Sequence, residues 1–346
     1  YTPGGIDWSA QAALDIGGAD EIHGESGDDF LYGMKGDDVL FGEGQDDDIV
    51  GGTGNDWISG GTGQDGVLGD DGRIATSRNG TVDPLGGVTV ATTQGFISTP
   101  GSVQQADLNV TGQLKKTVDV TPFSTDPNFN GTADEFDGVS RRNADDIIYG
   151  GLGSDFLHGG SGDDAMSGAE AMWPFYAKPT NPGNVLAYDP VTTEFALYDE
   201  YLPRTRIAGF LLNFNPLEGM AVGSPTWGTV YSDGDDKIFG DNGNDWIVGG
   251  TGRDNLYGGW GNDLLNADDD QGTTGGTNDA PDTHPSYEDR AYGGAGRDVL
   301  IANTGGDRLI DWGVPQDRVV QLDWWEETQV DGVRFAATPA QDFSGR

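Results

Sequence analysis

Aspartates recur at nine-residue intervals along much of this 346-residue chain; most have glycine two positions before, and all have an apolar residue two positions after. Two units, Gly51–Ser59 and Gly60–Leu68, follow the pattern Gly-Gly-x-Gly-x-Asp-x-apolar-x throughout. A carboxylate supplies the hard anionic oxygen that calcium prefers as a ligand. Glycine reaches positive φ at low steric cost, so the neighbouring carbonyl oxygens can turn toward a cation. The spacing therefore predicts loops that bind calcium through oxygen atoms.

Seventeen aspartates share this register, and we expect all but the last, Asp317, to supply side-chain ligands. They are Asp20, Asp29, Asp38, Asp47, Asp56, Asp65, Asp146, Asp155, Asp164, Asp236, Asp245, Asp254, Asp263, Asp289, Asp298, Asp307 and Asp317. Carbonyl oxygens of the glycine loops should complete each site, around Gly27, Gly36, Gly54, Gly63, Gly153, Gly162, Gly234, Gly243, Gly252, Gly261 and Gly296. Asp70 lies just past the register of its run, so we expect Asp56→Ala to weaken calcium binding more than Asp70→Ala.

A period of nine is neither helical nor a simple strand alternation; it fits a loop followed by a short strand. Two such units make one turn of a flattened coil, with the apolar residue pointing into a narrow core. The register occupies four runs, residues 15–68, 141–167, 231–266 and, more loosely, 287–320. We therefore predict an all-β fold, a parallel β-roll with large inserts. The runs should stack nearly coaxially, because each offers a raw edge that the next can cover.

The units Gly51–Ser59 and Gly60–Leu68 resemble the repeats of the RTX, or haemolysin-type calcium-binding, family of secreted bacterial proteins. This resemblance implies a parallel β-roll with several calcium ions, each bound between neighbouring loops on an edge of the roll. It also implies a chain that is unfolded in the low-calcium cytoplasm, leaves through a type I secretion channel and folds outside the cell. With one ion for each pair of stacked loops, separate runs would bind about nine ions, and stacked runs would bind more.

The composition is strongly acidic. The chain has 58 acidic and 18 basic residues and a formal net charge of −40, so nucleic acid and anionic membrane surfaces would repel it. It has no cysteine, so we expect calcium to take the place of disulfides. Its longest apolar stretches, such as 207–214, are too short for membrane insertion, which needs about 20 residues. The termini, Tyr1 and Arg346, lead us to expect a piece of a longer protein.

Five segments lie outside the runs. We interpret them as an N-terminal lead-in (1–14), an insert of β-hairpins projecting from the roll (69–140), an insert rich in aromatic residues and proline (168–230), a polar loop (267–286) and a C-terminal cap (321–346). In the first insert we expect strands at 87–97 and 103–123. In the second we expect a short helix at 169–176, while 194–201 and 206–214 could be strands or helices.

Aromatic residues flank the inward positions, where a solvent-exposed roll should carry small or polar side chains. They are Phe30, Tyr32, Phe41, Trp57, Tyr149, Phe156, Phe239, Trp246, Tyr257 and Tyr292. One interpretation is that an insert folds back and covers them. The other is that some of these rings contact another chain, since large exposed apolar patches usually mark interfaces.

Catalysis finds little support in the sequence, which contains neither G-x-S-x-G nor H-E-x-x-H. His23 and His158 end repeats on the outer strand face, which favours a surface or packing role, and His284 lies in the polar loop, either solvated or as a metal ligand. We expect no enzyme. The favoured function is a secreted, calcium-binding structural module of an extracellular assembly such as an adhesin stalk, surface layer or filament. The alternative is the C-terminal folding and secretion module of a larger type I-secreted enzyme.

Overall fold

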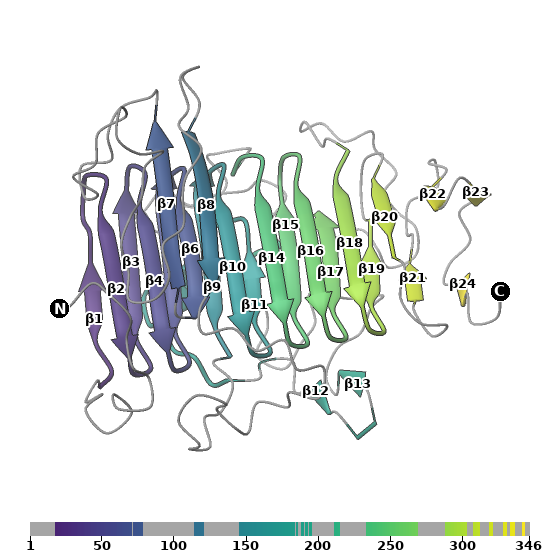
Figure 1. Ribbon diagram of the computed structural model, residues 1–346, viewed down its shortest axis with the longest axis horizontal. Coiled ribbons are helices and arrows are strands. Elements are labelled where there is room, and N and C mark those ends of the chain that lie inside the picture. The colour runs from purple at the N-terminus through teal and green to yellow at the C-terminus, as the bar shows by residue number, and fades with distance from the viewer. Residues whose placement is uncertain are drawn as a thin grey trace.

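The structure is a computed structural model, which describes residues 18–70, 72–78, 114–120, 145–183, 185, 188–189, 191–192, 194–195, 211–214, 233–268, 288–302, 307–311, 318–320, 328–330, 333–335 and 341–342. Two large sheets form the two sides of a flattened roll, whose turns follow one another from the N-terminal to the C-terminal end (Figure 1). All neighbouring strands within these sheets are parallel except the last pair. The expected all-β fold, a parallel β-roll, is confirmed.

Successive units of the chain alternate between the two sheets. The ten-stranded sheet contains β1 (Glu21–His23), β3 (Val39–Gly44), β5 (Trp57–Gly63), β9 (Ile147–Gly153), β11 (Ala165–Ser167), β15 (Trp246–Gly250), β17 (Leu264–Asp268), β19 (Val299–Ile301), β21 (Arg318–Val320) and β24 (Gln341–Asp342). The eight-stranded sheet contains β2 (Phe30–Lys35), β4 (Asp48–Thr53), β6 (Gly66–Asp70), β10 (Phe156–Ser161), β14 (Lys237–Asn242), β16 (Asn255–Trp260), β18 (Arg290–Ala295) and β20 (Arg308–Ile310).

The four repeat runs join into one continuous roll. Strand β5 of the first run pairs with β9 of the second, and β10 pairs with both β6 and β14. Strands β16 and β17 of the third run pair with β18 and β19 of the fourth. Each junction keeps the repeat register, so that Ile58 lies opposite Ile148 and Leu157 opposite Ile238. The predicted coaxial stacking is therefore confirmed.

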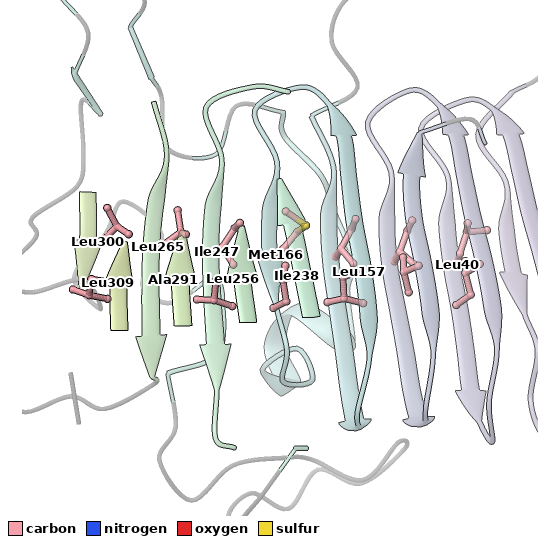
Figure 2. Packing of buried hydrophobic residues seen from close by; sticks show 14 of the residues in the cluster. Leu40, Leu157, Met166, Ile238, Ile247, Leu256, Leu265, Ala291, Leu300 and Leu309 are labelled. Atoms are coloured by element: carbon pink, nitrogen blue, oxygen red, sulfur yellow. The ribbon is translucent and has the colours of Figure 1, made fainter. Parts of the chain in front are cut away.

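The core between the sheets consists of two facing rows of apolar side chains, one from each sheet (Figure 2). It consists of the residues two places after the phased aspartates, with Ala302 added and Ile22 partly buried at the N-terminal end. Its buried members are Leu31, Leu40, Ile49, Ile58, Val67, Ile148, Leu157, Met166, Ile238, Ile247, Leu256, Leu265, Ala291, Leu300, Ala302 and Leu309. One buried side chain for each nine residues is a small core, so the loops must contribute to stability.

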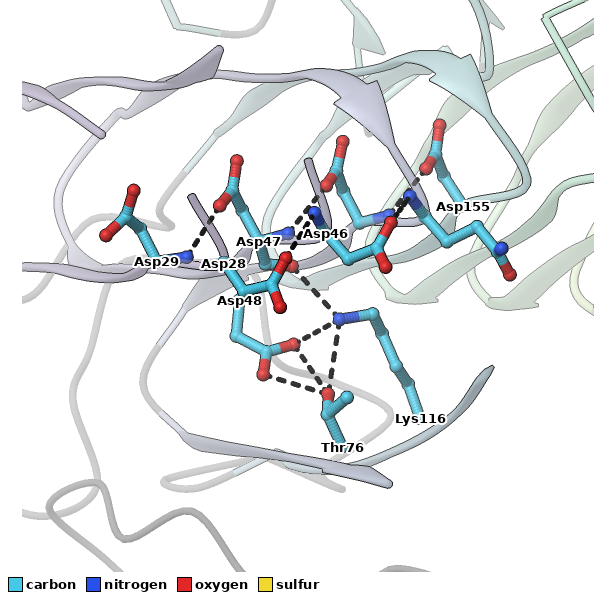
Figure 3. Close-up of polar contacts among 10 residues, drawn as sticks. Asp28, Asp29, Asp46, Asp47, Asp48, Thr76, Lys116 and Asp155 are labelled. Atoms are coloured by element: carbon cyan, nitrogen blue, oxygen red, sulfur yellow. Dashed lines mark hydrogen bonds and ion pairs between the residues drawn. The ribbon is translucent and has the colours of Figure 1, made fainter. Parts of the chain in front are cut away.

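The first insert packs against the roll. Strands β7 (Gly72–Arg78) and β8 (Leu114–Val120) form an antiparallel hairpin, and Ile74 is buried against Val50 and Leu68 on the outer face of the eight-stranded sheet. The expected hairpin is therefore present, but this pair packs against the sheet instead of projecting from the roll. An ion pair between Lys116 and Asp48 holds the hairpin in place (Figure 3). Of the two expected strands, 103–123 contains β8, whereas 87–97 lies outside the described residues.

The second insert covers the outer face of the ten-stranded sheet. Leu211, Leu212 and Phe214 pack in one buried cluster with Trp57 and Trp246, which are at most 1% exposed. This segment contains the short helix α2 (Trp173–Tyr176), inside the expected 169–176, and the hairpin of β12 (Tyr188–Asp189) and β13 (Glu194–Phe195). Residues 211–214 form neither helix nor strand. For the aromatic residues of the repeats that belong to this buried cluster, coverage by an insert is confirmed.

A row of rings on the eight-stranded sheet remains half-buried. His158, Phe239, Tyr257 and Tyr292 stack face to face on neighbouring strands, with ring centroids 4.4–4.9 Å apart. The buried cluster under the β7–β8 hairpin does not include these rings. We refer to these four side chains, together with the neighbouring Phe156, as the aromatic row.

At the C-terminal end, β22 (Thr328–Val330) and β23 (Val333–Phe335) form an antiparallel hairpin, and β24 adds antiparallel to β21. None of the described helices is long and apolar enough to cross a membrane. The lead-in at 1–14, His284 and Asp317 lie outside the described residues.

Candidate calcium-binding loops

The phased aspartates line the two edges of the roll as two ladders. On one edge, which we call the first ladder, lie Asp20, Asp38, Asp56, Asp146, Asp164, Asp245, Asp263 and Asp298. On the other, the second ladder, lie Asp29, Asp47, Asp65, Asp155, Asp236, Asp254, Asp289 and Asp307. The backbone N–H of each aspartate donates to Oδ1 of the next in its ladder, at 2.7–3.0 Å.

The ladders are not broken by the inserts. Asp56 donates to Asp146 and Asp65 to Asp155, although 90 residues separate the members of each pair. The same hydrogen bond crosses the second insert, from Asp155 to Asp236, and the polar loop, from Asp254 to Asp289. Each interrupted loop is thus closed in space, and its aspartate occupies the same place as in an uninterrupted loop.

In twelve of these residues the second carboxylate oxygen is buried and accepts no hydrogen bond. This holds for Oδ2 of Asp29, Asp38, Asp47, Asp56, Asp65, Asp146, Asp155, Asp164, Asp236, Asp245, Asp254 and Asp263. Figure 3 shows the carboxylates of Asp29, Asp47 and Asp155 extending to the same side of the second ladder. A buried polar atom without a partner costs about 1–3 kcal/mol, and more when it is charged. The arrangement is unfavourable unless a cation lies beside these oxygens.

Burial perturbs the acidity of the ladder. It raises the pKa of Asp47 to about 8 and that of Asp65 and Asp254 to about 7. The pKa of Asp146 is raised well above its ordinary value, mainly by burial and to a smaller extent by the negative charges of Asp56, Asp164 and Asp70. Like charges packed in a dry environment favour either a proton or a metal ion. A divalent cation between adjacent loops would relieve both the burial and the repulsion.

Glycine places main-chain oxygens beside the carboxylates. A Cβ built on Gly33 would lie 2.6 Å from Oδ2 of Asp38 and 2.5 Å from the carbonyl oxygen of Gly51, one turn further along. A carboxylate oxygen and a carbonyl oxygen of the next loop therefore converge on one point. Gly54, with φ of 143°, shows a second constraint, because a side chain there would collide with the carbonyl of Gly36.

The eleven glycines named from the sequence occupy equivalent loop positions. Ten of them have positive φ, and Gly296 packs against the carbonyl oxygen of Gly261. Within the part of the chain that the structure describes, no three His, Cys, Asp or Glu side chains converge to hold a metal. A bound cation would therefore need carbonyl oxygens as well as aspartates. This donor set of hard oxygen atoms fits calcium.

Two sets of polar side chains beside the ladders lie outside the aspartate register. The residue before each phased aspartate is often Asp or Asn, and it forms an outer ladder: Asp37 accepts from the N–H of Asn55, and Asp163 from that of Asn244. The frequent Asp or Asn at this position is a signal in the sequence from which the outer ladder could have been predicted. The other set is Asp70 and Asp233, which are buried beside the ladders at the ends of inserts.

His23 and His158, the two histidines that the structure describes, lie apart from these loops. His158 is 2.7 Å from Asp241 and stacks on Phe239, whereas His23 lies between Glu21 and Glu43. Both carboxylates raise the pKa of His23. These contacts agree with the expected packing role on the outer strand face.

Substituting a glycine beside the carboxylates should impair calcium binding. In Gly150→Ala the new methyl group would lie 2.5 Å from Oδ2 of Asp155 and 2.6 Å from the carbonyl oxygen of Gly168. We expect a loss of about 1–3 kcal/mol in the free energy of unfolding, typical of overpacking, and a higher calcium concentration at the folding midpoint. Denaturant unfolding at several fixed free calcium concentrations measures both.

Gly44→Ala is the matched control. Its methyl group would have only ordinary contacts, the nearest being the carbonyl oxygen of Glu25 at 3.4 Å. Neither Gly150 nor Gly44 has positive φ, so backbone strain does not separate the two variants. Equal calcium midpoints for the two variants would show that the space beside Asp155 does not hold the ion.

Comparisons with known proteins agree with this geometry. The sequence profile of RTX calcium-binding nonapeptide repeats (four copies) matches residues 16–49, 41–73, 142–170, 231–265, 239–273 and 286–310. An uncharacterized protein of Mycobacterium bovis and two of Mycobacterium tuberculosis are each 54% identical over 41 residues, 12% of this chain. The match spans only 11% of those proteins. Repeats of this family are structural calcium-binding units and typify secreted bacterial proteins. The repeat region of this chain thus belongs to the RTX calcium-binding repeat family.

Proposed function

We propose that this chain is a secreted structural module that folds on binding calcium outside the cell. The observation that carries the proposal is the double ladder of buried aspartates, whose Oδ2 atoms face main-chain oxygens of the adjacent loop. The ladder aspartates are the proposed side-chain ligands, and the glycine loops supply the carbonyl ligands. Calcium bound there would neutralise charge that otherwise opposes folding in a chain of net charge −40.

Continuity of the ladders raises the expected number of ions. Each ladder has eight loops and seven hydrogen-bonded intervals, including those across the inserts. With one ion for each pair of adjacent loops, the roll would bind roughly fourteen ions rather than the nine of separate runs. The inserts therefore do not divide the calcium array.

The direct test is the calcium content of the folded protein. Equilibrium dialysis against buffered calcium should show on the order of ten to fourteen ions per chain, bound with positive cooperativity because neighbouring sites share an aspartate. Anomalous diffraction from crystals grown in calcium would locate them along both edges. Fewer than about four ions in these loops would refute the calcium-array proposal.

The aromatic row supports an extracellular assembly. Its rings lie on an outer face and are spaced by the strand repeat, so a second copy could pack a flat sheet face against them. Calcium would then control assembly as well as folding, because only the folded roll aligns the rings.

Charge placed in the aromatic row should reduce self-association. We expect wild-type protein in calcium to sediment as oligomers and Tyr257→Asp to sediment mostly as monomers, because a carboxylate in the contact must be desolvated. Val191→Asp, at a residue that is 89% exposed outside the row, is the control. Wild-type protein that is monomeric at all calcium concentrations would remove the assembly role and leave the alternative, a folding and secretion module of a larger exported enzyme.

A further inference from the structure

Two inserts enter the chain inside calcium loops, and each leaves a buried aspartate at the interruption. The first, residues 69–140, begins with Gly69 and Asp70, in the loop that ends at Asp146. The second, residues 168–230, is followed by Asp233, which lies three residues before Asp236. Asp70 is 6% exposed and Asp233 is fully buried. Neither belongs to the nine-residue register, so the repeat pattern does not account for them.

Both aspartates bind the next loop in the same way. The carboxylate of Asp70 accepts from the backbone N–H and the hydroxyl of Ser161, at 2.7 and 2.6 Å. The carboxylate of Asp233 accepts from the same two groups of Thr251, at 3.0 and 2.9 Å. Ser161 and Thr251 occupy the same position of their loops, two residues after the first glycine.

In these two places a carboxylate replaces a main-chain oxygen. In uninterrupted loops, a side chain on the second residue would meet the carbonyl oxygen one turn back: Gly52 meets that of Met34, and Gly259 that of Asp241. At the equivalent Gly160, the nearest atom is Oδ2 of Asp70, 2.7 Å from a built Cβ. At Gly250 it is Oδ2 of Asp233. At both places an aspartate carboxylate oxygen lies where the uninterrupted loops have a backbone carbonyl oxygen.

The surroundings of Asp70 are already crowded with negative charge. Its negative charge raises the pKa of Asp56, Asp146 and Asp164. The Oδ2 atoms of these three residues are buried and accept no hydrogen bond. The negative charge of Asp233 likewise raises the pKa of Asp236 in the second ladder. A further carboxylate among buried carboxylates is unfavourable unless a cation is shared between them.

We propose that Asp70 and Asp233 are calcium ligands that complete the two loops interrupted by the inserts. Each would supply the oxygen that an uninterrupted loop takes from its backbone, and would fasten the base of its insert to the calcium array. This inference rests on the proposed calcium-dependent folding. The sequence repeats the arrangement once more, because Asp268, where the polar loop begins, is in register with Gly250 as Asp70 is with Gly52.

The test compares loss of charge with loss of the hydrogen bond. Asp70→Asn and Asp233→Asn keep a side-chain oxygen that can accept from Ser161 or Thr251 but remove the carboxylate. Ser161→Ala and Thr251→Ala remove the hydroxyl donor and leave the carboxylate. Glu21→Gln, at a side chain that is 70% exposed, controls for the change in net charge. Bound calcium per full-length chain is counted by equilibrium dialysis. The slope of unfolding free energy against the logarithm of free calcium counts the ions taken up on folding.

Each Asp→Asn variant should bind one calcium ion fewer than wild type, with a correspondingly lower slope, and the double variant two fewer. Ser161→Ala, Thr251→Ala and Glu21→Gln should keep the full number. An unchanged ion count and slope in the Asp→Asn variants would overturn the inference. So would a variant that stays unfolded at every calcium concentration, because loss of one ligand from a long array should leave the other sites able to fold. If wild-type protein itself takes up no calcium, the proposed function fails rather than this assignment.

Discussion

Excess chelator should convert the roll into an expanded chain without regular β-structure. Each nine-residue unit contributes only one apolar side chain to the core between the sheets, while the edges carry buried carboxylates whose Oδ2 atoms accept no hydrogen bond. Without calcium nothing offsets the repulsion within the ladders. Circular dichroism should lose its β signal, and the radius of gyration should rise from on the order of 20–30 Å toward about 65 Å. Restored calcium should reverse both changes.

Two controls separate bound ions from general screening. Molar sodium chloride shortens the Debye length to about 3 Å and should still fail to refold the chelated protein, because it cannot supply ligands to buried oxygens. Magnesium should be a weak substitute, because it keeps its waters and demands octahedral geometry. Full β content in excess chelator would contradict calcium-coupled folding, and refolding by sodium chloride alone would show that only net charge matters.

The roll could be predicted from the sequence because each nine-residue unit determines the structure of its own loop and strand. One rule, an apolar residue two places after each aspartate, identified nearly every core residue from Leu31 to Leu309. The same rule placed the aspartates on the two edges, since alternate units must lie on opposite sides of a turn. Stacking of separate runs also followed, because the edge strands of a run have unpaired backbone groups that another strand can satisfy.

The packing of the inserts could not be predicted from such a rule, because their contacts are not periodic. Ser59 donates to Glu170 across 111 residues, and the hydroxyl of Tyr149 donates to the carbonyl of Leu211 across 62. Each contact depends on how two distant segments pack, which no spacing records. Asp70 illustrates the limit: its place past the register suggested a minor role, whereas the structure puts it against Ser161 of the next loop.

Lys116→Met should be among the most destabilising single substitutions in the described part of the chain. The Nζ of Lys116 lies 2.5 Å from Oδ1 of Asp48 and 3.1 Å from the carbonyl oxygen of Asp47 (Figure 3). Both charged side chains are at most 5% exposed. Removing the cation leaves the carboxylate buried, with the hydroxyl of Thr76 as its remaining donor among the described residues. Breaking such a pair costs about 3–5 kcal/mol, measured here by urea unfolding in saturating calcium.

The control and the double variant show what the pair contributes. Lys237→Met removes the same charge from an exposed side chain of the eight-stranded sheet and should change stability by less than about 0.5 kcal/mol. Asp48→Asn combined with Lys116→Met removes both charges and should recover much of the loss, because the cost of Lys116→Met lies mainly in the buried anion left behind. Faster hydrogen exchange in β7 and β8 than in β4 would show that the hairpin detaches before the roll unfolds. A Lys116→Met protein as stable as Lys237→Met would mean that apolar contacts around Ile74 alone hold the hairpin on the sheet.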